Sequence, residues 1–327
     1  MKRIAVAGLG TVGKRHAQNV MAHPGAELAA VIDPASEVLR EIPAPSFATI
    51  HAIDMPVDGL ILATPTPLHA EGAAIAAARG WPLLVEKPVA HTLASANALI
   101  EAVRDVPVLI GHHRRYHTCV RALRDGLEAG RIGRPVIANL LWAVKKPDDY
   151  FQQSWRTIDG SPVLINLVHD LDLLRMLFGE ITRVAALPGA LVRQAGRTES
   201  GAIALAFAGG VTATIAFADT APSPWSFEAG TGENPHIGAT GEDMLFIAGT
   251  DGGVSFPSLT WWHGTGWDKP ATAAPDPVER TNALAIQLDH FLDVIDGAAP
   301  HVTLQDGQAA LGAALEIERQ MMDRKAV

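Results

Sequence analysis

The stretch RIAVAGLGTVGKRHAQNVMAH, residues 3–23, decides how the first part of this chain folds. A short apolar run leads into Gly8, Gly10 and Gly13, and a segment with helical character follows. Glycines in G-x-G-x-x-G spacing between a strand and a helix are typical of a dinucleotide-binding turn. The first allows a tight bend, the second lets a pyrophosphate approach the backbone, and the third lets the helix pack against the strand. The phosphates would lie at the helix N-terminus, where free N–H groups favour anions.

A carboxylate follows this motif at the spacing expected for ribose recognition. The apolar run AELAAVID ends in Asp33, twenty residues after Gly13. A carboxylate there accepts hydrogen bonds from the adenosine ribose and would repel the 2′-phosphate of NADP. Pro34 comes next, where an arginine would be needed to hold that phosphate. The sequence therefore predicts NAD as the cofactor, with NADP the less favoured alternative.

Strands and helices alternate through the rest of the first third. The runs VDGLILATP, WPLLVEKP and VPVLIGHHRRY read as strands, with helical segments between them. Such alternation indicates a parallel sheet covered by helices on both faces. Ligands bind at the carboxyl ends of parallel strands. We therefore expect one crevice beside the glycine loop to be lined by Thr64, Glu86, Lys87 and the segment 112–114.

Composition and charge exclude several classes of protein. With 327 residues the chain is long enough for two domains. Its formal net charge of −9 argues against nucleic-acid binding, which normally needs a basic face. No run approaches about eighteen apolar residues and the N-terminus lacks the apolar core of a signal peptide, so we expect a cytoplasmic protein without a membrane partner. The single cysteine, Cys119, allows no internal disulfide and reads as a small buried side chain.

A second informative stretch, VLINLVHDLDLLRML at 163–177, has the composition of a buried helix interrupted by polar side chains. Ser161 before it is a suitable N-cap, and Gly179 after it is typical of a residue just past a helix end. We therefore expect a helix over about 162–178.

The polar side chains of this helix have two possible explanations. Asn166, His169 and Asp170 share one side, because residues three and four positions apart are neighbours on a helix. Either these groups satisfy one another in a core, or the helix delivers them to a cavity. In the second case His169 could take and return a hydroxyl proton near neutral pH, with Asp170 or Asp172 holding its tautomer.

Five segments together resemble the Gfo/Idh/MocA oxidoreductase family. They are GLGTVGKRHA near the start, TPTPLHAE at 64–71, VEKPVA at 85–90, GHHRRYH at 111–117 and the helix VLINLVHDLD. The resemblance implies an α/β fold. A Rossmann domain with a parallel sheet would occupy residues 1–118, and an α+β domain with a large, mainly antiparallel open sheet would occupy residues 119–327. It also implies NAD(P)-dependent oxidation or reduction of sugars, polyols, inositols or similar hydroxylated compounds.

The same resemblance assigns candidate site residues. Lys87 matches the family's active-site lysine, His169 its histidine acid and base, and Arg114 a substrate-side position. Lys87 would stabilise the reacting oxygen as hydride leaves the adjacent carbon, and a cis bond before Pro88 would fix a sharp turn there. The predicted cofactor-binding residues are Gly8, Gly10, Thr11, Val12, Gly13, Asp33, Thr64, Pro65, His69, Glu86 and Lys87. The predicted substrate-binding residues are His113, Arg114, Trp155, Asn166 and Asp170.

The sequence leaves the substrate open. Many family members place an aspartate four residues before the histidine, where this chain has Ile165, with Asn166 one position later. Substrate contacts therefore cannot be copied from inositol dehydrogenases. Arg114 could hold a carboxylate through two hydrogen bonds, so a cyclic hydroxy acid competes with a neutral polyol and a reducible sugar. The alternative function is an NAD(P)-binding sensor or transcriptional co-regulator without turnover, which the presence of both Lys87 and His169 disfavours.

Three further features concern surroundings and partners. The segment 223–238 could form a lid over the substrate, or it could cap a sheet edge or a subunit contact. The histidines of GHHRRYH lack acid or cysteine partners, so we expect no metal site. One face of an open sheet is normally covered, which predicts a homodimer or homotetramer.

Overall fold

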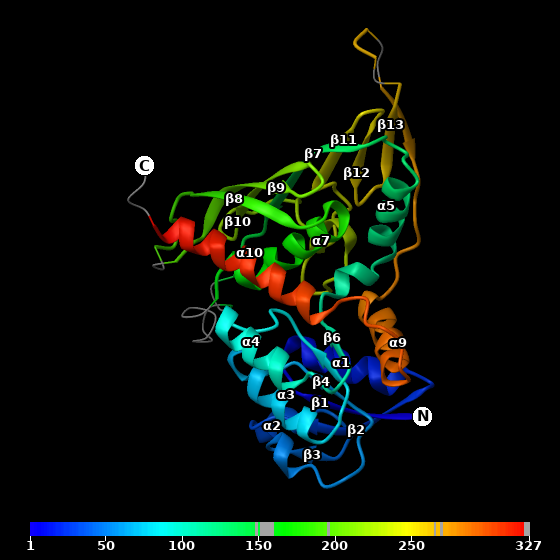
Figure 1. Cartoon of the computed structure of the whole chain (residues 1–327), viewed down its shortest axis with the longest axis vertical. Coiled ribbons are helices and arrows are strands. Elements are labelled where there is room, and N and C mark those ends of the chain that lie inside the picture. Colours follow the sequence, from blue (N-terminus) through cyan, green and yellow to red (C-terminus); the bar gives the residue numbers. More distant parts are fainter. Residues whose placement is uncertain (148–149, 151–159, 195–196, 265, 269–270, 324–327) are drawn as a thin grey trace. The chain divides into compact units, whose positions relative to one another are not determined.

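A computed structural model describes residues 1–147, 150, 160–194, 197–264, 266–268 and 271–323. The chain forms two compact units (Figure 1). The N-terminal unit comprises Met1–His113 and Ala283–Gly312, and the C-terminal unit comprises Arg114–Asn282 and Ala313–Val327. The chain first passes from one unit to the other inside a short 3-10 helix, η3 (His113–Tyr116).

The N-terminal unit is built on a parallel sheet of six strands, in the order β3-β2-β1-β4-β5-β6. The strands are β1 (Lys2–Ala7), β2 (Ala26–Ile32), β3 (Ser46–Phe47), β4 (Gly59–Leu62), β5 (Leu83–Val85) and β6 (Val108–Ile110). The connecting helices are α1 (Thr11–Ala22), α2 (Ser36–Leu39), η1 (Ile50–Ala52), η2 (Thr66–Leu68), α3 (His69–Ala78) and α4 (Leu93–Ala102). The central strands are buried and read as continuous apolar runs, as expected for a sheet covered on both faces. The predicted Rossmann sheet is confirmed.

Helix α9 (Ala283–Ile295) belongs to the N-terminal unit, although it follows most of the C-terminal unit in the sequence. It packs so closely on β4 that a Cβ added to Gly59 would lie 2.7 Å from Cδ1 of Ile295. After α9 the backbone N–H of Ile110 donates to the carbonyl oxygen of Val302 at 3.0 Å. The structure therefore differs from the predicted division after residue 118, because α9 buries its apolar face on the first unit.

The C-terminal unit contains a sheet of eight strands in the order β14-β13-β12-β11-β7-β10-β9-β8. They are β7 (Pro135–Ala143), β8 (Ile181–Pro188), β9 (Ser200–Phe207), β10 (Thr212–Ala218), β11 (Leu245–Gly249), β12 (Gly253–Phe256), β13 (Thr260–His263) and β14 (Thr272–Pro275). Strands β7 and β10 pair in parallel and the other neighbours pair antiparallel. The predicted large, mainly antiparallel sheet is confirmed.

Helices cover one face of this sheet. They are α5 (Thr118–Glu128), α7 (Val168–Phe178) and the part of α10 (Leu304–Met322) that belongs to this unit. Alternate side chains of the strands point toward them, among them Ile203 and Leu205 of β9 and Ile215 of β10. These pack with Leu171 and Leu174 of α7 in one hydrophobic core. Among the described residues, no helix is long and apolar enough to cross a membrane.

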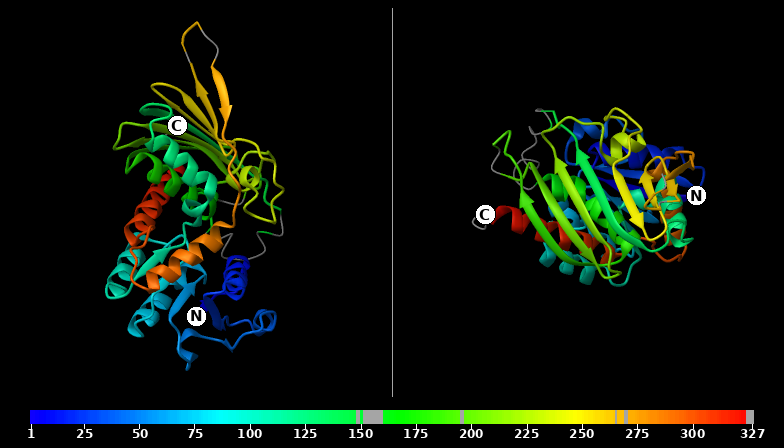
Figure 2. Two further views of the ribbon diagram at one scale, coloured as in Figure 1. Left: turned by 90° about the vertical axis from the view of Figure 1, so that its right-hand side faces the viewer. Right: turned by 90° about the horizontal axis from the view of Figure 1, so that it is seen from above.

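The opposite face of the same sheet carries small, exposed side chains. Ala202 and Ala204 of β9 and Thr214 and Ala216 of β10 alternate with the buried positions. Phe246 of β11 is also exposed, at 45%. Figure 2 shows this broad strand surface with the helices of the unit behind it. The predicted homodimer or homotetramer would need such an exposed sheet face, and the oligomeric state itself stays a prediction.

Candidate active site

The glycine motif forms a tight turn between β1 and α1. Gly8 has a φ of +87°, and its N–H donates to the carbonyl oxygen of Ile32 at 2.8 Å. A Cβ on Gly8 would lie 2.4 Å from the carbonyl oxygen of Ala63, and one on Gly13 would lie 1.8 Å from the carbonyl oxygen of Gly8. Neither position can hold a side chain without moving the backbone, because backbone atoms already occupy that space, those of Ala63 at Gly8 and those of Gly8 itself at Gly13.

The start of α1 is open where a pyrophosphate would bind. Gly10 is the N-cap residue, and no side chain caps the free N–H groups of the first turn. A Cβ on Gly10 would meet no atom within 4 Å, and Thr11 beside it is exposed. Free backbone donors and a helix dipole without an acidic residue in the first turn suit an anion. The residues present therefore fit a dinucleotide at this turn.

Asp33 is held beside the glycine turn by two backbone hydrogen bonds. Its Oδ2 accepts from the N–H of Leu9 at 2.8 Å, and its Oδ1 accepts from the N–H of Ala35 at 2.9 Å. The first bond joins the end of β2 to the turn after β1. The carboxylate is thus fixed next to the place where a bound adenosine ribose would lie.

Glu86 and Lys87 follow β5, and the bond between Lys87 and Pro88 is cis. Oε1 of Glu86 lies 2.9 Å from Nε2 of His16 on α1, and both side chains are buried. Burial alone would raise the pKa of Glu86, but the hydrogen bond and charge of His16, with the charges of His113 and Lys87, lower it to about 2. Glu86 is therefore an ionised anchor between α1 and the strand end that carries Lys87.

His69 links two loops rather than facing open space. Its Nε2 lies 2.9 Å from the carbonyl oxygen of Thr64, and its Nδ1 lies 3.1 Å from that of Pro88. Burial holds the pKa of His69 below its usual range, against the opposing effect of these backbone carbonyl oxygens. His69 thereby positions the segments around Thr64 and Pro65 and around Lys87.

The polar helix of the C-terminal unit has the predicted limits and one unexpected feature. Oγ of Ser161 accepts a hydrogen bond from the N–H of Leu164 at 3.1 Å, and Gly179 ends the helix with a φ of +88°. The first turn, η5 (Val163–Leu167), is π-helical, and α7 continues from it. The prediction of a helix over 162–178 is confirmed. A π turn is typical of helices that position functional side chains, and this one contains Asn166.

Arg114 is surrounded by carboxylates of its own unit. Its Nη1 donates to Oδ1 of Asp170 at 2.8 Å, and its Nη2 donates to Oε1 of Glu228 at 2.7 Å. Its Nε lies 3.8 Å from Oε1 of Glu233, and its guanidinium carbon lies 4.1 Å from the centre of the Phe227 ring. With both ends of the guanidinium engaged and 2% of the side chain exposed, Arg114 acts as an internal counter-ion. That geometry leaves no open fork for a substrate carboxylate.

One carboxyl group of this cluster, that of Asp170, has an unusual environment. Three carboxylates face one guanidinium, and Oδ2 of Asp170 is buried without a hydrogen-bond partner among the described residues. Burial, together with the charges of Glu228 and Glu233, outweighs the attraction of Arg114 and raises the pKa of Asp170 to about 7. Glu228 also accepts a hydrogen bond from Nε1 of Trp142 at 3.1 Å. The acidic side chains of the segment 223–238 are thus anchored inside the unit.

The other residues of the polar helix are buried or held by cations. Asp172 accepts hydrogen bonds from Nε and Nη2 of Arg115, at 2.8 and 2.6 Å. His169 is 5% exposed. Oδ1 of Asn166 accepts a hydrogen bond from Nζ of Lys146 at 2.7 Å. No motif in the sequence pointed to Lys146, since a Lys-Lys pair after a strand is usually a solvated surface feature.

The remaining predicted site residues belong to different units of the structure. Lys87 and the nine-per-cent-exposed His113 belong to the N-terminal unit, and His169 belongs to the C-terminal unit. Trp155 lies outside the described residues. Within the described part of the chain, no group of three or more histidine, cysteine or acidic side chains could hold a metal ion.

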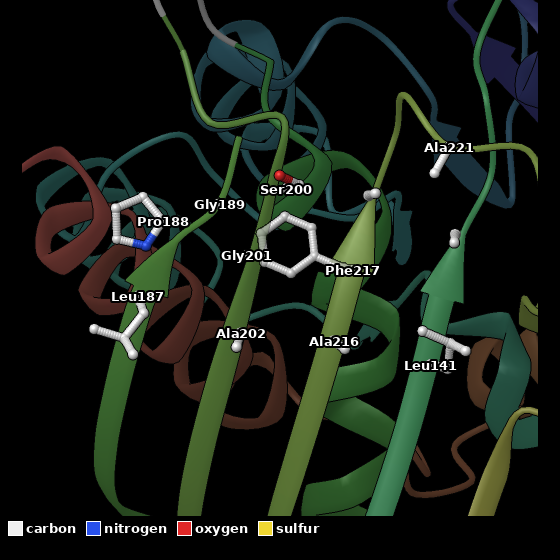
Figure 3. A pocket seen from close by; sticks show the side chains of 12 residues that line it. Leu141, Leu187, Pro188, Gly189, Ser200, Gly201, Ala202, Ala216, Phe217 and Ala221 are labelled. Atoms are coloured by element: carbon white, nitrogen blue, oxygen red, sulfur yellow. The ribbon is translucent and has the colours of Figure 1, made fainter. Parts of the chain in front are cut away.

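One hollow in the surface lies away from the candidate site residues. It lies on the exposed face of the C-terminal sheet, among strands β7, β8, β9 and β10 (Figure 3). Leu141, Leu187, Pro188 and Phe217 line it together with small residues, and none of the candidate site residues does. The hollow is shallow and apolar, which suits contact with another surface better than chemistry on a polar substrate.

Comparison with known proteins places both units in one family. Residues 2–112 match the model described as "Oxidoreductase family, NAD-binding Rossmann fold", and residues 120–255 match the model of the "GFO/IDH/MocA C-terminal domain". The two matches lie on either side of the passage between the units.

Relatives of known activity align along almost the whole chain. Inositol 2-dehydrogenase of Rhizobium meliloti (strain 1021) is 27% identical over 340 residues, which cover 99% of this chain and 98% of that enzyme. The scyllo-inositol 2-dehydrogenase (NAD(+)) of Bacillus subtilis (strain 168) is 27% identical over 323 residues, covering 92% and 88%. A solved structure of UDP-N-acetylglucosamine 3-dehydrogenase from Acidithiobacillus ferrooxidans superposes with a TM-score of 0.78 at 25% identity, covering 98% and 97%.

Proposed function

This chain belongs to the Gfo/Idh/MocA oxidoreductase family, and from that premise we propose that it is an NAD-dependent dehydrogenase. The reaction moves a hydride between the nicotinamide and a secondary alcohol or carbonyl carbon of a small hydroxylated substrate. Its substrate class is a sugar, polyol, inositol or cyclic hydroxy acid, in keeping with the names of the relatives.

The observation that carries this proposal is the turn that joins β1 to α1. Two glycines allow backbone contacts there, Gly10 leaves the helix start open, and Asp33 is bonded to the turn through Leu9. The preference for NAD over NADP rests on the same carboxylate, since a 2′-phosphate placed against Asp33 would meet a negative charge.

Lys87 and His169 divide the work on the substrate oxygen. Bound NAD supplies the acceptor for the hydride. During oxidation His169 takes the hydroxyl proton while the carbon–oxygen double bond forms, and it returns that proton during reduction. Lys87 donates a hydrogen bond to the same oxygen and stabilises its developing negative charge. Glu86 and His69 hold the segment from which Lys87 extends.

The engagement of Arg114 narrows the substrate contacts. Because both terminal nitrogens of its guanidinium donate to Asp170 and Glu228, a carboxylate on the substrate would have to find another donor. Arg114 therefore serves to position Asp170 and Glu228, and beside the catalytic His169 the helix offers Asn166 as a polar contact for the substrate.

The test is NAD reduction, followed by absorbance, against inositols, aldoses, UDP-sugars and cyclic hydroxy acids. Lys87→Met and His169→Asn should each lower turnover by about 10²- to 10⁴-fold, with NADH binding measured by fluorescence little changed. Lys145→Met and His263→Asn are matched controls from outside the proposed site. Tight NADH binding without turnover of any panel member would favour the sensor function instead.

We further propose that the protein works as a homodimer or homotetramer. The exposed face of the C-terminal sheet supports this, because the side chains that β9 and β10 expose there are small alanines and threonines, and β11 adds the exposed Phe246. A second copy could cover such a face without clashes from long side chains.

A further inference from the structure

Two adjacent lysines after β7 have opposite surroundings. Lys145 is exposed, whereas 7% of Lys146 is exposed. The backbone N–H of Lys146 donates to the carbonyl oxygen of Asp219 at 3.1 Å, which fixes the chain at this point. Its ammonium lies 4.7 Å from the centre of the Tyr150 ring and 5.8 Å from that of Trp142. Aromatic faces stabilise a cation at such distances, so the buried ammonium keeps a defined place.

That ammonium determines which way the amide of Asn166 faces. Nζ of Lys146 donates to Oδ1 of Asn166 at 2.7 Å. A lysine ammonium has donors and no acceptor, so only the amide oxygen can face it. The orientation of Asn166 therefore follows from chemistry, and its Nδ2 points away from Lys146.

The other end of the amide is open. Within the described residues Nδ2 of Asn166 makes no hydrogen bond, and the side chain is partly exposed. Asn166 lies three positions before His169, on the same helix. An isolated asparagine could accept or donate, but with its oxygen held this one presents two N–H donors. The positive charge of the Lys146 ammonium beside its oxygen also polarises the amide and strengthens those donors.

We propose that Lys146 is a positioning residue that turns Asn166 into a donor-only contact, so that the preferred substrate carries an acceptor oxygen, a carboxylate or ketone, at this point. This inference rests on the proposed dehydrogenase function and deepens it. A carboxylate or ketone oxygen uses the donors of Asn166 fully. A hydroxyl can also accept, but its own proton then needs a further partner.

Binding to the NADH-loaded protein tests this preference without turnover. D-glucuronate and D-glucose are suitable probes for calorimetry, because they differ only in a carboxylate against a hydroxymethyl group. We expect glucuronate to bind the wild-type protein about 10- to 100-fold more tightly, the range expected for hydrogen bonds to a charged group. Lys146→Met should remove the preference. Lys146→Arg should keep it, since arginine also offers only donors, and Lys145→Met should leave it unchanged.

A second variant reverses the contact. Asn166→Asp would pair with Lys146 and leave an acceptor oxygen in place of the amide N–H groups, so glucuronate should lose its advantage. In turnover assays Lys146→Met should raise KM much more than it lowers kcat. Equal binding of the two probes to the wild type, binding of neither, or an unchanged preference in Lys146→Met would overturn the inference. Full turnover in Lys87→Met would instead defeat the proposed mechanism and leave the binding preference standing.

Discussion

Replacing Asp170 by asparagine should change how the stability of the C-terminal unit depends on pH. In the folded protein the buried carboxyl faces Arg114, Glu228 and Glu233, and its pKa is raised from 3.8 to about 7. In the unfolded chain it would lose its proton near pH 4. Between these values the unfolded state binds fewer protons, so this group makes folding less favourable as the pH rises.

The size of the effect follows from the same two values. Each pKa unit corresponds to about 1.4 kcal/mol, so the loss from Asp170 is about 4 kcal/mol once the pH exceeds 7, and about 3 kcal/mol of it falls between pH 5 and pH 8. Asp170→Asn keeps an acceptor oxygen for Nη1 of Arg114 and has no proton to lose. Relative to the wild type, the variant should therefore gain about 3 kcal/mol across this interval.

The assay is unfolding in urea at half-unit steps from pH 5 to pH 8, followed by the fluorescence of buried tryptophans such as Trp142. Asp58→Asn is a suitable control. Asp58 is paired with Arg3, and its pKa is lowered from 3.8 to about 2. It therefore loses its proton below pH 5 in both the folded and the unfolded protein. The stability difference between that variant and the wild type should not change from pH 5 to pH 8. Parallel curves for Asp170→Asn and the wild type would refute the reasoning, because Asp170 would then ionise normally.

Three further substitutions have direct consequences. Gly13→Ala places a Cβ where the carbonyl oxygen of Gly8 now lies, so the free energy of unfolding should fall by about 1–3 kcal/mol in a thermal unfolding scan, and NADH should bind more weakly. The Cβ of Gly10→Ala meets no protein atom, so this variant should bind NADH more weakly and keep its melting temperature. Asp33→Ser removes the charge opposed to a 2′-phosphate, and the ratio of kcat/KM for NAD to that for NADP should fall by about tenfold or more; a constant ratio would show that Asp33 does not discriminate. Ala204→Arg puts a long cation on the exposed sheet face, and light scattering should show a smaller particle if a second copy covers that face.

The parts of this protein that sequence predicts well are those whose geometry is local. The glycine spacing between residues 8 and 13 and the carboxylate of Asp33 belong to one strand–turn–helix–strand unit. The backbone conformation of that unit itself requires these residue types. The helix limits at Ser161 and Gly179 are local for the same reason, because a cap needs only the adjoining turn.

What sequence could not predict depends on partners far along the chain. Arg114 reads as a free guanidinium beside a strand end. Its partners Asp170 and Glu228 come from two helices, α7 and the short α8 (Phe227–Thr231), 56 and 114 positions away. Lys146 is the same residue type as its neighbour Lys145, and only the folded structure shows that Lys145 is exposed whereas Lys146 is buried. Local patterns also could not predict that α9 belongs to the N-terminal unit. The amphipathic pattern of a helix shows that one face is buried, but not which core it packs against.

The sequence left open whether the polar side chains of the helix 163–178 belong to a core or to a site. The structure indicates different roles for the two ends of this helix. The acids Asp170 and Asp172 are met by arginines inside the C-terminal unit, so these two groups belong to the core. Asn166 behaves differently, because Lys146 satisfies its oxygen and leaves its nitrogen without a protein partner in the described chain. Two ion pairs with buried carboxylates thus hold the helix in place, and on that support it can present Asn166 in one fixed orientation. The two roles are therefore compatible, because the buried pairs of Asp170 and Asp172 fix the helix that carries Asn166.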